Sequence, residues 1–375
     1  MKYYIIAGEA SGDLHGSNLV KNLRIEDSDA EIRAWGGELM EAQGADVVKH
    51  YRDLAFMGFS EVLMNIRTIL KNFDLCKKSI LEFDPDVLIL IDYPGFNLRM
   101  AKFAHQKGIK VFYYISPQIW AWKQNRVKQI RAYVDQMYVI LPFEKEIYAK
   151  FDVEVEFVGH PLIDAVEQFK TRIESRSEFL SRHGIDDKPY VLLMPGSRKQ
   201  EIATMLPVML RAASKIPDFQ YIIAGAPSQD MAFYEKFLEH SGVRVLSGET
   251  YPLLTFANAA MVTSGTATLE TAIFGVPQVV CYKGGFISYL IARSLVKIKY
   301  ISLVNLIMDR EVVTELIQRD LSVKKLMKEF KQIAFESERQ TALLNDYKEL
   351  HALLGGGGAS ALTAKLMLKT LRNTD

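Results

Sequence analysis

Short apolar segments with high β propensity alternate with longer helical patterns along almost the whole chain, and this alternation constrains the fold most. Ten segments are expected to be strands: residues 3–7, 31–35, 87–91, 110–115, 136–140, 190–194, 220–224, 244–246, 260–263 and 278–281. Several are apolar at every position, as strands covered on both faces must be. Strand–helix alternation favours right-handed crossovers and parallel sheets, so the sequence predicts an α/β protein.

The strand series starts again near Tyr190, which predicts two Rossmann-like, doubly wound domains facing each other across a cleft. A length of 375 residues suits two domains of about 100–200 residues each. We expect a first domain at 1–168, a charged linker at 169–189 and a second domain at 190–345. Residues 346–375 are expected to be helical, with packing against the first domain as one option. Their four glycines, 355–358, are compatible with a sharp turn or with a flexible surface loop.

Composition and residue spacing exclude several classes of function. The formal net charge of +1 gives no long-range field that would attract nucleic acid. Cys76 and Cys281 lie far apart and outside metal-ligand spacings, which fits a reducing compartment. The seven histidines are isolated, and Asp84-Pro85-Asp86 precedes its strand and is interpreted as a turn, although it is similar to the DxD of metal-dependent sugar transferases. We expect neither a metal nor another cofactor.

Two loops of the first domain follow expected strands. Residues 8–13, Gly-Glu-Ala-Ser-Gly-Asp, leave backbone N–H groups at a helix start, where they can hold an anion or a sugar hydroxyl, or simply form a turn. This loop is not a GxGxxG, so a dinucleotide is disfavoured. Asp92 directly follows the buried strand 87–91. An acidic side chain is energetically unfavourable there unless it has a polar partner or takes part in function. Its alternative role is a helix N-cap or Asx turn.

An aromatic segment at 113–123 contains Trp120 and Trp122 and precedes Arg126, Lys128 and Arg131. Aromatic faces pack on sugars or acyl chains, and cations hold phosphate. The pattern fits equally a helix with one core side and one solvated basic side.

Two loops of the second domain suit a nucleotide diphosphate. Residues 195–198, Pro-Gly-Ser-Arg, combine a glycine for close backbone approach with a guanidinium for phosphate. The loop lacks the GK[ST] ending of an NTPase phosphate loop, so ATP hydrolysis is disfavoured. Residues 264–270 offer backbone donors at a helix start and then Glu270, which suits a ribose diol or complements the helix dipole.

Taken together, these motifs resemble those of the lipid-A-disaccharide synthases, two-domain inverting glycosyltransferases of the GT-B type. The resemblance covers nearly the whole chain and rests on GEASGD at 8–13, MGFSEV at 57–62, DYPGFN at 92–97, YYISPQIWAWKQNR at 113–126, LPFE at 141–144, GHP at 159–161, PGSR at 195–198 and SGTATLE at 264–270. The SP-x-x-WAW run is highly specific, whereas PGSR and GTATLE are partly shared with other transferases. Val304 stands where the family usually has proline, and Gly95 where an acid is common.

The resemblance implies that UDP-2,3-diacylglucosamine donates its sugar to the 6-hydroxyl of 2,3-diacylglucosamine 1-phosphate, giving a β(1→6) tetraacyl disaccharide 1-phosphate and UDP. Inversion needs a general base. Asp92 is the expected base, with Glu9 and His15 as reserves. The residues expected to bind the donor are Gly196, Ser197, Arg198, Gly265, Thr266, Ala267, Thr268, Glu270, Asn305 and Gln318. Those expected to bind the acceptor or its lipid are Ser11, Asn97, Ser116, Trp120, Trp122, Lys123 and Arg126.

Other functions remain open from the residues alone. An undecaprenyl-linked GlcNAc transferase and a UDP-sugar 2-epimerase share the two-domain pattern, but the SP-x-x-WAW run argues against both. A non-catalytic nucleotide-sugar or glycolipid binding protein would require Asp92 to be dispensable for turnover. A homodimer is a further open state.

Membrane contact is expected to be peripheral. No stretch reaches the roughly 18 uninterrupted apolar residues that cross a bilayer. Apolar residues on one expected helix face form a candidate membrane patch: Val62, Leu63, Ile66, Ile69 and Leu70. The nearby cations Arg67, Lys71, Lys77 and Lys78 suit anionic lipid. Because both implied substrates carry acyl chains, we expect a cytoplasmic protein on the inner face of the cytoplasmic membrane. The alternative is that this face packs against the sheet of the first domain.

Overall fold

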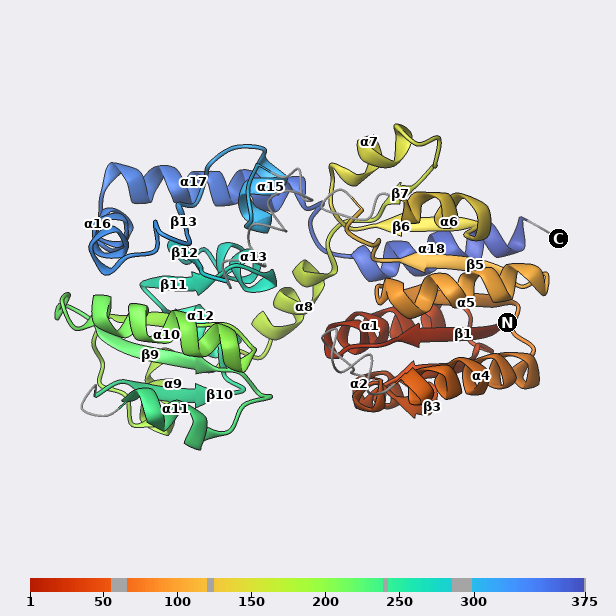
Figure 1. Cartoon of the computed structure of the whole chain (residues 1–375), viewed down its shortest axis with the longest axis horizontal. Helices are drawn as coiled ribbons and strands as arrows, with labels where there is room; N and C mark the ends of the chain where they lie inside the picture. The colour runs from red at the N-terminus through yellow and green to blue at the C-terminus, as the bar shows by residue number, and fades with distance from the viewer. Residues whose placement is uncertain (55–65, 120–124, 239–241, 285–298, 374–375) are drawn as a thin grey trace. The chain divides into compact units, whose positions relative to one another are not determined.

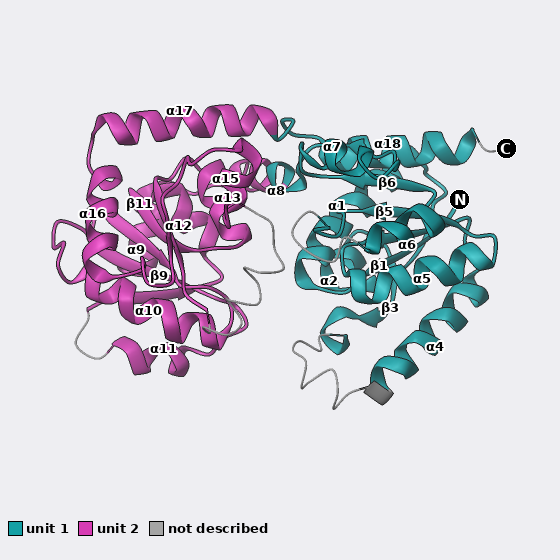
Figure 2. Ribbon diagram, turned by 45° about the horizontal axis from the view of Figure 1, so that its top comes forward, with its two compact units in different colours: residues 1–164, 354–375 teal, residues 165–353 magenta. Residues whose placement is uncertain are grey.

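The structure, a computed structural model, describes residues 1–54, 66–119, 125–238, 242–284 and 299–373 (Figure 1). It forms two compact units, coloured separately in Figure 2: unit 1 comprises residues 1–164 and 354–375, and unit 2 comprises residues 165–353. Each unit is built on one parallel sheet, as the sequence predicts.

Unit 1 contains a seven-stranded sheet in the order β3-β2-β1-β4-β5-β6-β7. Its strands are β1 Lys2–Ala7, β2 Glu31–Gly36, β3 Asp46–His50, β4 Val87–Ile91, β5 Lys110–Tyr114, β6 Gln136–Val139 and β7 Glu156–Phe157. Its helices are α1 Ala10–Glu26, α2 Glu38–Ala42, η1 Tyr51–Asp53, α4 Ile66–Phe83, α5 Pro94–Gln106, α6 Arg126–Tyr133, α7 Glu144–Ala149, α8 Pro161–Lys170, which continues into unit 2, and α18 Ala359–Arg372.

The two faces of this sheet have separate cores, because side chains alternate along each strand. Tyr4, Leu88 and Tyr113 face one core, to which α4, α5 and α6 contribute. The opposite core contains Tyr3 and Tyr114 together with residues of α1 and α18. The strands between the edges are therefore covered on both faces, which explains their continuous apolar sequences.

Unit 2 contains a six-stranded sheet in the order β10-β9-β8-β11-β12-β13. Its strands are β8 Tyr190–Met194, β9 Gln220–Gly225, β10 Arg244–Ser247, β11 Ala259–Thr263, β12 Gln278–Tyr282 and β13 Glu315–Ile317. Its helices are α9 Arg176–His183, α10 Lys199–Ala213, α11 Met231–Leu238, α12 Thr250–Phe256, α13 Thr266–Ile273, α15 Leu303–Met308, α16 Val323–Ala334 and α17 Glu338–Leu353. Residues of α9 and α12 pack on one face of the sheet, with Leu192 and Val262.

All ten expected strands are present, each bound differing by at most one residue from the expectation. Three strands were not expected from the sequence: β3, β7 and β13. Each lies at an edge of its sheet. Edge strands are covered less completely, so they lack the continuous apolar run that identifies the others.

The segment 169–189, expected to be a linker, contains α9 and belongs to unit 2. Ser175 and Glu178 form a capping box at the start of α9, and Gly184 ends the helix with a φ of 59°. Phe179 and Leu180 are buried in the core of unit 2. The charges that suggested a linker therefore belong to the solvent side of a packed helix, and the boundary falls after Asp164.

The C-terminal segment is divided between the units: α17 belongs to unit 2, and α18 packs on α1 in unit 1. Gly355 has a φ of +89°, and a Cβ there would lie 3.2 Å from the Cα of Gly159. The Asp164 carboxylate accepts hydrogen bonds from the backbone N–H groups of Gly358 (2.6 Å) and Ser360 (2.9 Å). The glycine run thus forms a sharp turn fixed against α8.

Candidate functional site

The strand order of each sheet reverses next to its first strand, between β1 and β4 in unit 1 and between β8 and β11 in unit 2. Open α/β sheets bind ligands outside the carboxyl ends of their strands at such switch points. In unit 1, Ala7 pairs with Ile91, so Gly8 and Asp92 begin neighbouring loops. In unit 2, residues 195–198 follow β8 and residues 264–270 follow β11. Four motifs of the sequence analysis therefore lie at the two switch points.

The backbone at Asp92 is strained and held in place. Asp92 and Tyr93 have φ values of 44° and 47°, in the left-handed region that non-glycine residues rarely occupy. The Asp92 carbonyl accepts hydrogen bonds from the Tyr113 hydroxyl (2.5 Å) and from the Asn97 side-chain amide (2.7 Å). The Asp92 N–H donates to the carbonyl of Tyr114 (3.1 Å). Such strain persists only where the surroundings over-determine it, and it is concentrated at functional sites.

The neighbouring glycine is required by packing. A Cβ at Gly8 would lie 2.3 Å from Cδ1 of Tyr93. The Tyr93 hydroxyl donates to the carbonyl of Leu54 (3.2 Å), which fixes the ring over the β1 loop. Gly8 therefore allows the loops after β1 and β4 to approach each other.

The Asp92 carboxyl is half-buried, and its pKa is raised to about 6. Burial is the largest cause, the negative charge of Glu9 adds to it, and the positive charge of Arg126 opposes it. The structure therefore brings three predicted site residues together. A carboxylate whose pKa lies near neutrality suits a general base.

Asp13 and Ser11 have different environments, although both belong to the GEASGD motif. Asp13 is buried and accepts hydrogen bonds from the N–H groups of Gly37 (2.7 Å) and Met40 (3.2 Å). It therefore holds the start of α2. Ser11 is exposed in the first turn of α1.

His15 lies with His160 and Asp164. Burial lowers the pKa of His15 to about 4, against the effect of Asp164, and burial with the neighbouring His15 lowers the pKa of His160 to about 3. His15 is thus neutral at pH 7.

Two predicted acceptor-binding residues are buried and have structural partners. Asn97 is fully buried and holds the Asp92 loop through its amide. Ser116 is buried and donates to the carboxylate of Glu144, which also accepts the N–H of Leu141 (2.9 Å). Trp120, Trp122 and Lys123 lie outside the described residues.

The loop after β8 already holds an anion of the chain itself. The N–H groups of Ser197 and Arg198 each lie 3.3 Å from Oε2 of Glu201. The Arg198 guanidinium is mostly exposed and lies 3.6 Å from Oε1 of the same carboxylate. Gly196 has a φ of +108°, and a Cβ there would lie 2.7 Å from Glu201 Oε2. The backbone therefore binds a carboxylate where the sequence predicts a diphosphate.

At the start of α13, Gly265 and Thr266 are exposed and Ala267 is half-buried, whereas Thr268 is fully buried and donates to the Gly265 carbonyl (2.8 Å). Glu270 is half-buried and accepts a hydrogen bond from the Tyr251 hydroxyl (3.2 Å). Burial raises the pKa of Glu270, and the Tyr251 hydroxyl lowers it.

Asn305 contacts the segment before β13, and Gln318 follows the carboxyl end of that strand. Asn305 is fully buried, and its Oδ1 accepts the N–H groups of Val312 (2.8 Å) and Val313 (2.9 Å), so it holds the turn before β13. Gln318 directly follows β13 with a φ of 54°, and its N–H donates to the carbonyl of Tyr282 (2.8 Å). Its side-chain amide faces the backbone of Gly284.

Tyr113, Tyr251 and Glu201 were not identified from the sequence. Each contacts a predicted site residue, but Tyr251 and Glu201 lie outside the motifs, and the sequence indicates Tyr113 only as part of an aromatic segment. The S/T/D/N-x-x-E pattern of a capping box could have indicated Glu201, but Arg198 stands at its N-cap position. Over the described part of the chain, His, Cys, Asp and Glu do not gather in groups of three that suit a metal.

The sequence matches the family described as lipid-A-disaccharide synthetase over residues 3–361. The lipid-A-disaccharide synthase of Syntrophus aciditrophicus is 40% identical over 378 residues, covering 99% of this chain and 98% of that protein. The enzyme of the same name from Trichlorobacter lovleyi is 38% identical over 377 residues, covering 99% of this chain and 97% of that protein.

Solved structures show the same fold at low sequence identity. The UDP-GlcNAc 2-epimerase of Neisseria meningitidis bound to UDP-GlcNAc has a TM-score of 0.69 at 14% identity, covering 98% of this chain and 100% of that chain. The glycotransferase of kitacinnamycin has a TM-score of 0.65 at 13% identity, covering 99% of each chain. These likenesses confirm the expected GT-B type of α/β fold.

Proposed function

This chain belongs to the lipid-A-disaccharide synthetase family, and we propose that it joins two acylated glucosamines, one carried by UDP and one bearing a 1-phosphate. It is a glycosyltransferase of lipid A biosynthesis. The observation that carries this function is the family match over residues 3–361. The proposed donor is UDP-2,3-diacylglucosamine, the acceptor is 2,3-diacylglucosamine 1-phosphate, and the products are the β(1→6) disaccharide 1-phosphate and UDP.

In the proposed mechanism, Asp92 is the general base. The acceptor 6-oxygen forms a bond to the anomeric carbon of the donor while the bond from that carbon to the phosphate oxygen breaks, and the hydroxyl proton passes to Asp92. A pKa of about 6 leaves the carboxylate ionised at neutral pH and still basic enough to accept a proton. The two hydrogen bonds to the Asp92 carbonyl, from Tyr113 and Asn97, support this role, because a base must be held in a fixed position toward the proton that it removes.

The departing UDP gains negative charge, which Arg198 and the N–H groups of Ser197 and Arg198 would stabilise. That these N–H groups already face a carboxylate supports their use for an anion. Glu201 would have to release them, or share them, when the diphosphate binds. Glu270 would accept hydrogen bonds from the ribose diol.

The acceptor would lie beside Asp92. Arg126 is close enough to lower the pKa of Asp92, which supports a role in holding the acceptor's anionic 1-phosphate nearby. Ser11, exposed in the first turn of α1, would add a hydroxyl contact.

The reaction is tested by mass spectrometry of products made by the purified protein from the two acylated substrates. A synthase gives the tetraacyl disaccharide 1-phosphate and releases UDP only when the acceptor is present. UDP release without acceptor would support an epimerase, and no release would support a binding protein.

We further propose that the protein docks peripherally on the inner face of the cytoplasmic membrane through α4. Leu70 has 54% of its surface exposed, and a hollow of about 340 Å³ beside it is lined by Phe73, Lys77, Arg99 and Lys102 among others. Exposed apolar and cationic groups in one place suit an anionic lipid surface. In the described part of the chain, every helix is too short or too polar to cross a bilayer.

Only part of the predicted membrane patch supports docking. Ile69 packs against the core of unit 1, which is the alternative that the sequence left open. Val62 and Leu63 lie outside the described residues, as does the side chain of Ile66. Leu70→Ser tests the proposal, with Leu75→Ser as the matched control, because Leu75 is 49% exposed and lies about 140° round the same helix from Leu70. Loss of liposome sedimentation with Leu70→Ser alone, at unchanged melting temperature, supports docking. Equal sedimentation of the two variants contradicts it.

A further inference from the structure

We propose that Tyr251 is a positioning residue that holds the Glu270 carboxylate in place for the ribose diol of UDP. The proposal rests on the proposed function of Glu270 and adds a residue that lies outside every motif. Tyr251 itself need not touch the nucleotide.

The contact joins two helices of unit 2. Glu270 lies in the second turn of α13, which begins at the switch point after β11, and Tyr251 is the second residue of α12. The Tyr251 hydroxyl donates to Oε1 of Glu270 over 3.2 Å. Among the described residues, the Tyr251 hydroxyl is the one group that donates a hydrogen bond to this carboxylate. A donor on Oε1 leaves Oε2 available for a diol.

Aromatic packing fixes the Tyr251 ring. The ring centroid lies 5.5 Å from that of Phe169 on α8 and 5.2 Å from that of Phe274, directly after α13. The pair with Phe169 is edge-to-face, with an interplanar angle of 74°, and the pair with Phe274 is tilted at 53°. Packing against two rings restricts ring orientation. The direction of the Tyr251 hydroxyl is therefore set by packing within the protein and does not depend on the ligand.

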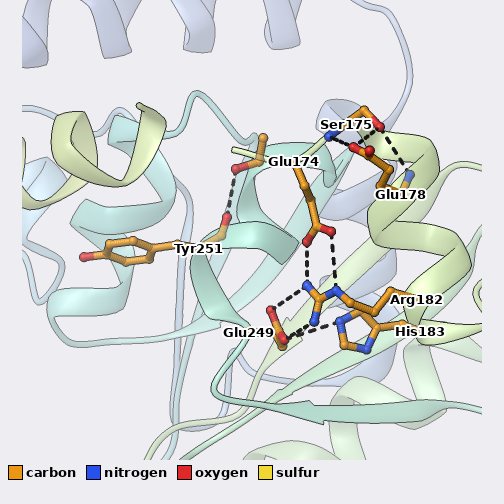
Figure 3. A network of polar contacts seen from close by, with 8 residues as sticks. Glu174, Ser175, Glu178, Arg182, His183, Glu249 and Tyr251 are labelled. Carbon is orange, nitrogen blue, oxygen red and sulfur yellow. Dashed lines mark hydrogen bonds and ion pairs between the residues drawn. The ribbon is translucent and has the colours of Figure 1, made fainter. Parts of the chain in front are cut away.

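An ion-pair network fixes the helix that carries Tyr251. Glu249, at the N-cap of α12, accepts a hydrogen bond from Arg182 (2.8 Å) and lies 3.4 Å from Nε2 of His183 (Figure 3). Arg182 also bonds to Glu174, so α9, the segment before it and the start of α12 are joined (Figure 3). Tyr251 is thus held by its ring and by its backbone.

Positioning matters here because Glu270 is partly withdrawn from water. Burial favours the neutral carboxyl, and a hydrogen bond to the charged form opposes this effect. Tyr251→Phe keeps the ring and removes only the donor. In this variant, the pKa of Glu270 rises further. As the pH is lowered, the carboxylate is therefore protonated at a higher pH than in the wild type.

The test compares the affinities of UDP and 2′-deoxy-UDP, which lacks one hydroxyl of the diol. Isothermal titration calorimetry of the full-length wild type, Tyr251→Phe, Glu270→Gln and the double variant gives the preference for UDP in each. We expect Glu270→Gln to remove the preference and Tyr251→Phe to reduce it about two- to tenfold, as loss of one hydrogen bond implies. The double variant should equal Glu270→Gln, and Tyr251→Phe should weaken 2′-deoxy-UDP, which keeps the 3′-hydroxyl, less than it weakens UDP.

Tyr221→Phe is the matched control. Tyr221 is also buried in unit 2, and its hydroxyl donates to the backbone carbonyl of Ile216 (2.9 Å), outside α12. It should lower the melting temperature without changing the preference for UDP. In Tyr251→Phe, the preference should also weaken more between pH 8 and roughly pH 6 than in the wild type, which a structural defect would not produce.

The outcomes separate this proposal from the function on which it rests. An unchanged preference in Tyr251→Phe, together with a lost preference in Glu270→Gln, overturns the role of Tyr251 alone. Equal weakening of UDP and 2′-deoxy-UDP by Tyr251→Phe also overturns it. An unchanged preference in Glu270→Gln removes the ribose role of Glu270, and the role of Tyr251 with it.

Discussion

The loops after β4 and β8 each lie beside the switch point of their own sheet, yet they are built in opposite ways. After β4, the non-glycine residues Asp92 and Tyr93 adopt positive φ, and buried side chains hold the loop. After β8, Gly196 adopts the positive φ, and the loop turns its N–H groups toward a carboxylate.

The proposed functions of the two loops explain the difference. A proton acceptor has to be desolvated and fixed, and the surroundings can offset strain of about 1–3 kcal/mol per residue to achieve this. An anion site needs accessible backbone N–H groups, which glycine allows without strain. Unit 1 is therefore expected to control the chemical step, and unit 2 the binding of the nucleotide.

The variant with the largest expected effect distinguishes the proposed role of unit 1 in the chemical step from that of unit 2 in nucleotide binding. Asp92→Asn should lower turnover by about 10²–10⁴-fold, because a general base is lost, and should leave UDP affinity within twofold of wild type. Product formation by mass spectrometry and calorimetry with UDP measure the two quantities. Turnover within a few-fold of wild type would transfer the role to Glu9 or His15.

Arg198→Ala is the corresponding change in unit 2, and it should affect UDP binding. Loss of a charge-assisted hydrogen bond should weaken UDP binding by about 1.5–3 kcal/mol, while the pH dependence of turnover stays unchanged. Arg211→Ala is the control, because Arg211 is an exposed cation in the last turn of the same helix. Chelators should change neither quantity, and inhibition by EDTA that Mg²⁺ or Mn²⁺ reverses would contradict a metal-free site.

A smaller effect tests whether the hydrogen bonds to the Asp92 carbonyl affect the rate of the chemical step. Tyr113→Phe removes one donor from the Asp92 carbonyl and should lower kcat about two- to tenfold at constant KM for the donor. Tyr4→Phe is the matched control, because Tyr4 faces the same core and its hydroxyl donates to Ser79 (2.9 Å). Equal losses in both variants would indicate a general effect of buried hydroxyls.

The smallest effect concerns pH. Turnover should fall as the pH drops through about 6, because protonation removes the Asp92 base. Glu9→Gln should move this fall to lower pH, because the like charge that helps to raise the Asp92 pKa is gone. The shift should be smaller than the one burial causes. A pH profile of kcat/KM, which reports the pKa of the free enzyme, measures it, and an upward shift would mean that Glu9 does not act on Asp92 through its charge.

Local sequence identified the strands because their apolar runs report burial on both faces. It also placed the candidate loops, since a motif that follows a buried parallel strand must emerge at the carboxyl edge. The same reasoning failed at 169–189, where exposed charges concealed the buried Phe179 and Leu180. Local pattern thus revealed where the loops are and left open what each side chain contacts.

Several motif residues proved to have structural partners that no motif predicts. Asn97 holds the Asp92 carbonyl, Ser116 binds Glu144, and Asn305 fixes the turn before β13. A short polar residue beside a strand end is compatible with ligand binding and with loop support. Only the position of its partner decides between the two.

The sequence by itself determined two parallel sheets, the positions of their strands other than β3, β7 and β13, and the family. Tertiary structure alone decided the raised pKa of Asp92, the donor on Glu270 and the return of α18 to unit 1. The physical reason is separation along the chain: Tyr113 is 21 residues from Asp92, Tyr251 is 19 from Glu270, and Asp164 is 196 from Ser360. Burial patterns are local, whereas desolvation and hydrogen bonding depend on residues that meet only when the chain folds.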